Sequence, residues 1–174
     1  MQLITLINLT DQFISGRSWW LFHNPKNDAN NILIEASELA ELFIKPSSTT
    51  EQHQACAEEL SDVLCATFAF SIVTKIDLVQ LLLQRLSVKA DSDSSLLSYT
   101  ELQASVLSQL APLGLKQFSS PTQVTLSLIY QAGRLADLFH WQSDEESKVR
   151  VQVQIARINQ IIAVSYTHLT LPTN

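Results

Sequence analysis

The chain repeats itself at an offset of 96 residues, and this internal similarity constrains the fold more than any other feature of the sequence. Residues 22–25, FHNP, align with residues 118–121, FSSP, and residues 33–43, LIEASELAELF, align with residues 129–139, IYQAGRLADLF. A period this long is typical of a duplicated unit, whereas solenoid repeats have periods of about 20–50 residues. The sequence therefore predicts two related halves.

The repeated unit has the pattern of long helices. Its apolar positions recur at spacings of four and three residues, as in Ile32, Ala36 and Leu39, which places them on one face of a helix. Pro25 follows Asn24, a pair that favours a helix start because proline lacks the N–H group that would have no partner there. Only three glycines occur among 174 residues. We therefore expect an all-α fold, with helices over residues 3–15, 25–44, 52–74, 77–88, 99–111, 122–141 and 145–164.

The predicted helix over residues 52–74 carries apolar residues around much of its circumference, including Leu60, Val63 and Phe70. Such breadth indicates burial on more than one side. The aromatic segment 18–23 breaks the helical period, and we expect it to be irregular, with Phe22 in the core.

The charge of the chain argues against nucleic acid as a partner. Acidic residues outnumber basic ones, the formal net charge is −6, and no run of Lys or Arg occurs. Binding to a phosphate backbone relies on such basic runs. The sequence also lacks a glycine-rich phosphate loop, zinc-ligand spacing and a serine-nucleophile motif.

The cysteines and the N-terminus favour a cytoplasmic protein. Cys56 and Cys65 are nine residues apart in one helical pattern, which places them on opposite faces and excludes a bond between them. The N-terminus lacks the basic region and cleavage site of a signal peptide. The longest apolar stretch, residues 63–73, is too short to span a bilayer. We therefore expect two free thiols and no membrane partner.

Two pairs of acidic residues are the strongest candidates for chemistry. Glu35 and Glu38 are three residues apart on one predicted helix, and Glu59 and Asp62 have the same spacing on the next. Two antiparallel helices would bring the four carboxylates together, and a hard divalent cation would relieve their repulsion and lost hydration. The alternative is that each pair lies on a solvated helix face, as acidic pairs at this spacing commonly do.

These pairs belong to a longer pattern. The motif W-x-x-F-H-x-P-K-N covers residues 19–27, E-x-x-E-L-x-E-L-F covers residues 35–43, E-E-L-S-D-V-L covers residues 58–64, and I-D-L follows at residues 76–78. The combination resembles the all-α nucleoside triphosphate pyrophosphohydrolases of the MazG kind, and looks most like their dCTP pyrophosphatase branch. The resemblance is strongest over residues 10–90.

The resemblance implies a MazG-like four-helix bundle in which Glu35, Glu38, Glu59 and Asp62 hold Mg²⁺, or Mn²⁺ in its place, on a nucleoside triphosphate. Water then cleaves between the α and β phosphates, which yields a monophosphate and pyrophosphate. Metal ions suit this chemistry because they neutralise developing charge and lower the pKa of bound water.

Substrate contacts are expected around the entry to the helix over residues 25–44. Trp19, Phe22 and His23 are candidates to stack on the base or hydrogen-bond to it, with a place in the core as the alternative, which we favour for Phe22. Lys26 is a candidate phosphate contact, with a solvated lysine as the alternative. Asn27, the last residue of the motif, is assigned to the same substrate site.

The second half keeps the packing pattern but loses the acidic residues. All four carboxylates are replaced, in order, by Gln131, Arg134, Gln154 and Arg157. It therefore cannot hold Mg²⁺ as the first half would, and we expect it to act as a built-in partner in a pseudo-dimer that is open to further homo-oligomerisation. Its two arginines either reach the triphosphate or pair with local acids.

Trp141 stands at a position where the family commonly has a Trp and where the first half has Lys45. It either covers the base from the second half or packs as an ordinary core aromatic. We assign it to the substrate site.

We divide the chain into an active unit at residues 1–90, a degenerate unit at residues 96–164 and a non-native or disordered tail at residues 165–174, with a short native tail as the alternative. The predicted function is Mg²⁺-dependent pyrophosphohydrolysis of a (deoxy)nucleoside triphosphate in nucleotide-pool cleaning. A helical dimerisation or regulatory module without useful turnover is the alternative from another class.

Overall fold

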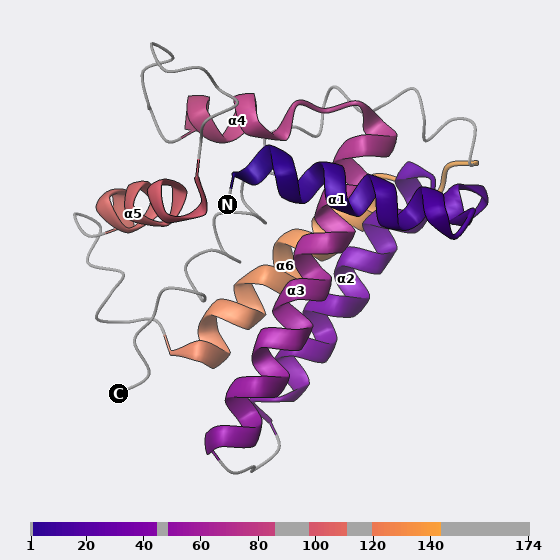
Figure 1. Ribbon diagram of the computed structural model, residues 1–174. Coiled ribbons are helices and arrows are strands. Elements are labelled where there is room, and N and C mark those ends of the chain that lie inside the picture. Colours follow the sequence, from indigo (N-terminus) through magenta and orange to yellow (C-terminus); the bar gives the residue numbers. More distant parts are fainter. Residues whose placement is uncertain (1, 45–48, 86–97, 111–119, 144–174) are drawn as a thin grey trace.

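The computed structural model of the chain describes residues 2–44, 49–85, 98–110 and 120–143, and every extended secondary-structure element within them is a helix. The elements, in chain order, are α1 (Leu3–Gly16), the 3₁₀ helix η1 (Trp19–Leu21), α2 (Pro25–Glu41), α3 (Thr49–Thr74), α4 (Leu78–Arg85), α5 (Tyr99–Leu110) and α6 (Pro121–Asp137) (Figure 1). The all-α prediction is confirmed. The helix predicted over 145–164 and the tail at 165–174 lie outside the described residues.

Helix α2 begins where the sequence predicts. The Asn24 side chain accepts a hydrogen bond from the backbone N–H of Asn27 at 2.9 Å, and Pro25 occupies the first turn. Helix α6 begins in the same way, with Ser120 as the capping residue and proline next. Both helices have 17 residues, and their bounds differ by the offset of the internal repeat. The duplication itself stays a prediction.

Both of these helices end earlier than the apolar pattern indicates. Helix α2 was expected to reach residue 44 and α6 residue 141, but they end at Glu41 and Asp137. The residues that follow form turns because their N–H groups bond three residues back, as Ile44 does to Glu41 and His140 does to Asp137. Such tighter bonds commonly satisfy the last carbonyls of a helix.

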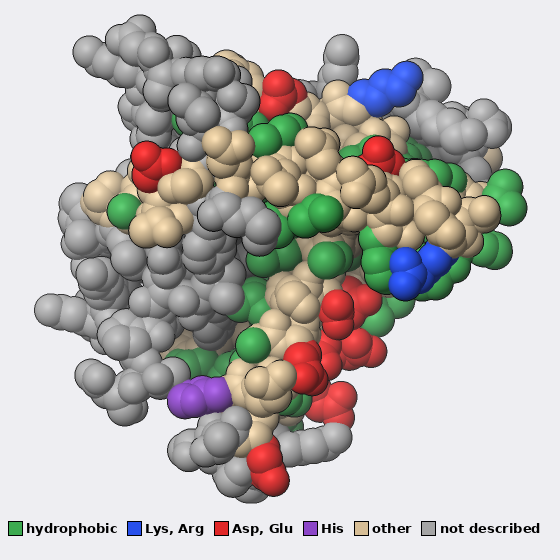
Figure 2. All heavy atoms as spheres, in the orientation of Figure 1, with side chains coloured by type: hydrophobic (Ala, Val, Ile, Leu, Met, Phe, Trp, Pro, Cys, Tyr) green, Lys and Arg blue, Asp and Glu red, His purple; other side chains and the backbone are tan. Residues whose placement is uncertain are grey.

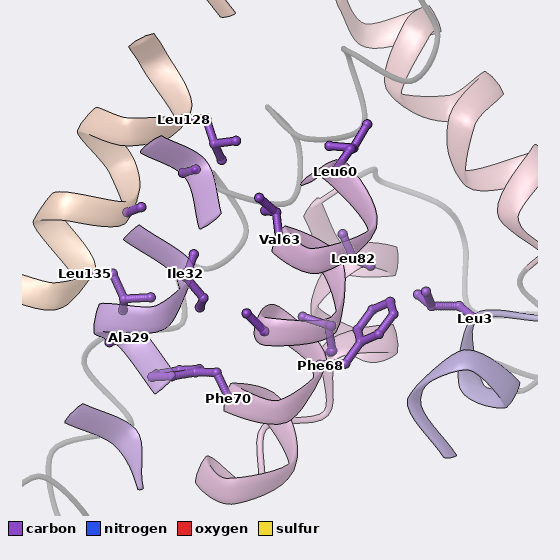
Figure 3. Packing of buried hydrophobic residues seen from close by; sticks show 14 of the residues in the cluster. Leu3, Ala29, Ile32, Leu60, Val63, Phe68, Phe70, Leu82, Leu128 and Leu135 are labelled. Carbon is purple, nitrogen blue, oxygen red and sulfur yellow. The ribbon is translucent and has the colours of Figure 1, made fainter. Parts of the chain in front are cut away.

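Helix α2 packs against two long helices, α3 on one side and α6 on the other, while α1 lies across α3 (Figure 1). Figure 3 shows Ile32 of α2 between Leu135 of α6 and Val63 of α3. All three side chains are buried. The breadth of the apolar surface on α3 is explained by its contacts with both α1 and α2.

The aromatic segment before α2 differs from the prediction in two respects. Residues Trp19–Leu21 form a short 3₁₀ helix, which follows a left-handed residue, Ser18, with φ of 57°. Phe22 is not in the core, because 69% of its surface is exposed. A single apolar residue can lie exposed without penalty at a turn, so its type alone did not determine its burial.

Two further expectations concern cysteines and membranes. Cys56 and Cys65 are free. No single described helix is both long and apolar enough to cross a bilayer, although residues Glu51–Thr74 and Leu78–Gln84, bent by 106° at their junction, meet that length and composition together. Phe68 and Phe70 of the longer segment are buried in the core.

The packing of α6 on α2 can be tested with two leucines of α6. Leu135 is fully buried in the shared core, whereas 57% of Leu126 is exposed. We expect Leu135→Ala to lower the free energy of unfolding by about 2–5 kcal/mol, because it leaves a cavity. Leu126→Ala should change it by about 0.5 kcal/mol or less. Urea unfolding of the full chain measures both, and equal effects would contradict the described packing.

Candidate active site

The acidic residues of α2 and α3 converge. Packing of α2 against α3 brings the carboxylates of Glu35, Glu38 and Glu59 together, so that one oxygen from each lies within 4.8 Å of the others. Glu35 and Glu59 are half-buried, and Glu38 is exposed. Figure 2 shows acidic side chains gathered over α2 and α3, beside the hydrophobic side chains under α1. The two pairs therefore meet across the α2–α3 contact, although Glu38 and Asp62 remain exposed to solvent, and a bound cation stays a prediction.

Asp62 lies close enough to this group for its charge to act on Glu35 and Glu59. Burial, then the charges of Glu38, Asp62 and Glu59, raise the pKa of the Glu35 carboxyl above its usual value. The pKa of Glu59 is raised as well, first by burial and then by Glu38, Asp62 and Glu58. The carboxylates therefore repel one another, and the site favours the approach of positive charge.

A cavity of about 440 Å³ opens next to the carboxylates. Glu35 and Asp62 form its acidic edge, and most of the remaining wall is apolar side chains of α1 and α3. Trp19 and His23 line it from the segment before α2, together with Asn31 of α2. A concave apolar space with a few polar groups at one edge is the usual form of a small-molecule site.

The aromatic rings at the wall of the cavity are held in place by an arginine side chain. The rings of Phe13 and Trp19 meet edge to face, with centroids 5.7 Å apart. The guanidinium of Arg17 lies 3.6 Å from the Phe13 ring centroid and 5.5 Å from that of Trp19. Cation–π contacts of this kind stabilise the arrangement of the rings. Trp19 is 44% exposed, so one part of it remains open to a ligand.

His23 is tied to a buried acid that the sequence did not single out. Its Nδ1 lies 2.7 Å from Oδ1 of Asp28, one turn into α2. Only 4% of Asp28 is exposed, and its second oxygen, Oδ2, has no hydrogen-bond partner in the described part of the chain. Burial raises the pKa of Asp28 to about 6, against the opposing effect of His23.

Lys26 and Asn27 make structural contacts and do not line the cavity. The Lys26 side chain is half-buried and donates to the backbone carbonyl of Gln142 at 3.1 Å. The alternative of a fully solvated lysine is therefore wrong. The Asn27 side chain donates to the carbonyl of Phe22 at 2.9 Å and braces the turn before α2. Their contacts with substrate stay predictions.

Of the residues singled out in the second half, those that the structure describes, Gln131, Arg134 and Trp141, are not among the residues that line the cavity or the carboxylate group. Trp141 does not line the cavity, and because 89% of it is exposed the expectation of a core aromatic is wrong. Arg134 lies over the ring of Tyr130, 5.6 Å from its centroid. The Oε1 atom of Gln131 is buried without a hydrogen-bond partner among the described residues. Gln154 and Arg157 lie outside the described residues.

Sequence reasoning missed the contribution of α1 and of two polar residues. Leu9 and Phe13 are exposed and four residues apart, a spacing that could have indicated an apolar strip on α1 facing a ligand. Asn31 precedes Glu35 by one turn and lies on the same side of α2. Asp28 carried no signal, because an acid in the first turn of a helix is common whether or not it is buried.

The donor set fits a hard divalent cation. Carboxylate oxygens are the preferred ligands of Mg²⁺ and Mn²⁺, and three of them lie within 4.8 Å of one another. The pKa values of Glu35 and Glu59 are raised in part by repulsion from neighbouring carboxylates, which a bound cation would relieve. Glu35, Glu38 and Glu59 are the residues that would hold it, with Asp62 at the cavity edge.

Comparison with known proteins agrees with this arrangement. Over 117 aligned residues the chain is 30% identical to dCTP pyrophosphatase 1 of Mus musculus, covering 59% of this chain and 69% of the mouse protein. The proteins of the same name from Bos taurus and Homo sapiens are 30% and 29% identical over the same shares. No protein-family model and no solved structure matches the chain.

The relatives are, by name, pyrophosphatases of dCTP. A helical bundle with converging carboxylates beside an apolar cavity agrees with that class of protein. The chain belongs to the family of the dCTP pyrophosphatases, a MazG-like family of nucleotide pyrophosphohydrolases.

The raised pKa of Asp28 gives the stability of the protein a testable dependence on pH. An acid with a pKa of 3.8 when unfolded and about 6 when folded favours the folded state at low pH, and that contribution is lost as the pH rises through about 6. We expect Asp28→Asn to raise the free energy of unfolding by about 1–2 kcal/mol above pH 7, because it removes a buried charge.

Urea unfolding between about pH 4 and pH 8 measures this effect. The difference between Asp28→Asn and the unmodified chain should grow as the pH rises. Asp137→Asn, at an exposed position at the end of α6, is the matched control and should leave the pH dependence unchanged. Parallel curves for Asp28→Asn and the unmodified chain would contradict the assignment.

Proposed function

We propose that the chain is a divalent-cation-dependent nucleotide pyrophosphohydrolase, which cleaves a (deoxy)nucleoside triphosphate to a monophosphate and pyrophosphate and serves to clean the nucleotide pool. The observation that carries this proposal is the meeting of three carboxylates within 4.8 Å, with Glu35 also lining the cavity. A nucleotide matches these two parts of the site, since its phosphates need cations and its base is a flat, largely apolar ring.

Each part of the site has a task in this reaction. Glu35, Glu38, Glu59 and Asp62 would hold the cation, and the apolar wall would receive the base beside Trp19 and His23. When bound, the cation supplies positive charge to the phosphate oxygens and lowers the pKa of bound water. One P–O bond forms from water and the bridging P–O bond between the α and β phosphates breaks, which releases pyrophosphate.

The names of the relatives favour a pyrimidine deoxynucleotide. The mouse, cattle and human proteins are named for dCTP, and we propose dCTP and related pyrimidine triphosphates as the first substrates for this chain. The apolar character of the cavity wall supports a base held chiefly by stacking.

Release of pyrophosphate from a panel of nucleoside triphosphates, with and without Mg²⁺ or Mn²⁺, tests the proposal directly. We expect turnover with at least one pyrimidine triphosphate, and its loss when the cation is removed with EDTA. No turnover on any triphosphate would reject an enzymatic function and favour the alternative, a helical dimerisation or regulatory module. Release of inorganic phosphate without pyrophosphate would reject the reaction class.

Substitution of the carboxylates distinguishes a cation site from a surface patch. We expect Glu38→Ala or Asp62→Ala to lower turnover at least about 100-fold, because water cannot replace the charge of a lost ligand. Glu51→Gln, an exposed acid on α3, should leave turnover unchanged. Equal losses in Glu38→Ala and Glu51→Gln would show that net charge, and not a cation site, is responsible.

The arginines of the second half should matter much less. We expect Arg134→Ala and Arg157→Ala to change turnover by less than about tenfold, because an arginine that only pairs with a local acid at a surface contributes about 0–1 kcal/mol. The same pyrophosphate assay measures both variants. A loss in Arg134→Ala as large as that in Glu38→Ala, in a folded protein, would make the second half a participant in catalysis.

A further inference from the structure

His23 is held from two sides. Its Nδ1 lies 2.7 Å from Oδ1 of Asp28, a short distance for a hydrogen bond between a ring nitrogen and a carboxylate. The Trp20 ring meets the His23 ring at an angle of 63°, with centroids 5.3 Å apart, and the Trp20 indole N–H is itself bonded to Ser15 at 2.8 Å. The imidazole is therefore fixed in orientation at the wall of the cavity.

The buried carboxylate of Asp28 is not explained by its contribution to folding. Asp28 has one hydrogen-bonded oxygen and one buried oxygen, Oδ2, without a partner in the described residues. An unpaired buried oxygen destabilises a fold, and an apolar side chain at this position would avoid that effect. The contact that Asp28 does make is with a residue that lines the cavity.

We propose that Asp28 is a positioning residue that fixes the His23 ring with its proton on Nδ1, so that Nε2 is left as the hydrogen-bonding atom for the ligand in the cavity. A carboxylate accepts and does not donate, so the Nδ1–H group must point to Asp28. Within the described residues Nε2 has no partner. In the neutral ring Nε2 is an acceptor, and it matches an N–H donor such as the amino group of a nucleobase.

The position of the proton can be measured without any assay of activity. In the full chain labelled with ¹⁵N-histidine, we expect the neutral His23 ring to carry its proton on Nδ1, with the signal assigned by its loss in His23→Gln. Asp28→Asn keeps an acceptor oxygen and should retain this tautomer. Asp28→Leu removes the acceptor and should shift the proton to Nε2, the form preferred by free imidazole side chains. An unchanged tautomer in Asp28→Leu would overturn the proposal.

The functional consequence rests on the proposed nucleotide site and is measured by a double-mutant cycle. We expect Asp28→Leu to raise KM for dCTP about tenfold with kcat changed less than about threefold, since it weakens binding and not chemistry. Asp28→Asn should stay within about threefold of the unmodified chain. In the His23→Ala background Asp28→Leu should have no further effect on KM, because Asp28 acts only through that ring.

The outcomes separate this inference from the proposed function. If no triphosphate is turned over, the proposed function fails, and the ¹⁵N tautomer still decides whether Asp28 fixes His23. If turnover is present but Asp28→Leu raises KM equally in the presence and absence of His23, Asp28 has only a structural role and the inference is wrong. Asp137→Asn, an exposed acid on α6, is the control and should change neither KM nor the tautomer.

Discussion

The arrangement of the site depends on the burial of α2 on two sides at once. Ala29, Ile32 and Ala36 are fully buried in the core that α2 shares with α3 and α6. Burial of these residues leaves the other side of the helix for most of its charged groups. Glu35 and Glu38 lie beside this buried face, where α3 brings Glu59 to meet them. Apolar packing thus overcomes the repulsion among carboxylates.

Much of this arrangement could be predicted from local patterns in the sequence. Helix starts follow from a capping residue and a proline, and the spacing of acidic pairs places them on one face of each helix. The ends of α2 and α6 could not be predicted to the residue, because the apolar pattern continues through the turns that follow Glu41 and Asp137. Helix ends depend on which backbone carbonyls find a hydrogen-bond donor, and this cannot be predicted from side-chain type alone.

The parts of the site that the sequence did not reveal depend on tertiary contacts. Phe22 is of a residue type typical of cores but lies exposed, whereas Asp28 is of a type typical of surfaces but lies buried. The burial of each depends on how α1 and the segment before α2 pack across the bundle. Neither position differs from its neighbours in periodicity, so no pattern within one helix could have distinguished them.

The contact between α2 and α6 has a consequence for how the carboxylates are supported. In an assembly of separate subunits, a helix that covers another is lost on dilution, and the stability of the site falls with protein concentration. Here α6 belongs to the same chain as α2, and the Lys26 side chain is bonded to the segment that follows α6. Association of the two helices is therefore intramolecular, and its equilibrium is set by the linker and not by the amount of protein in solution.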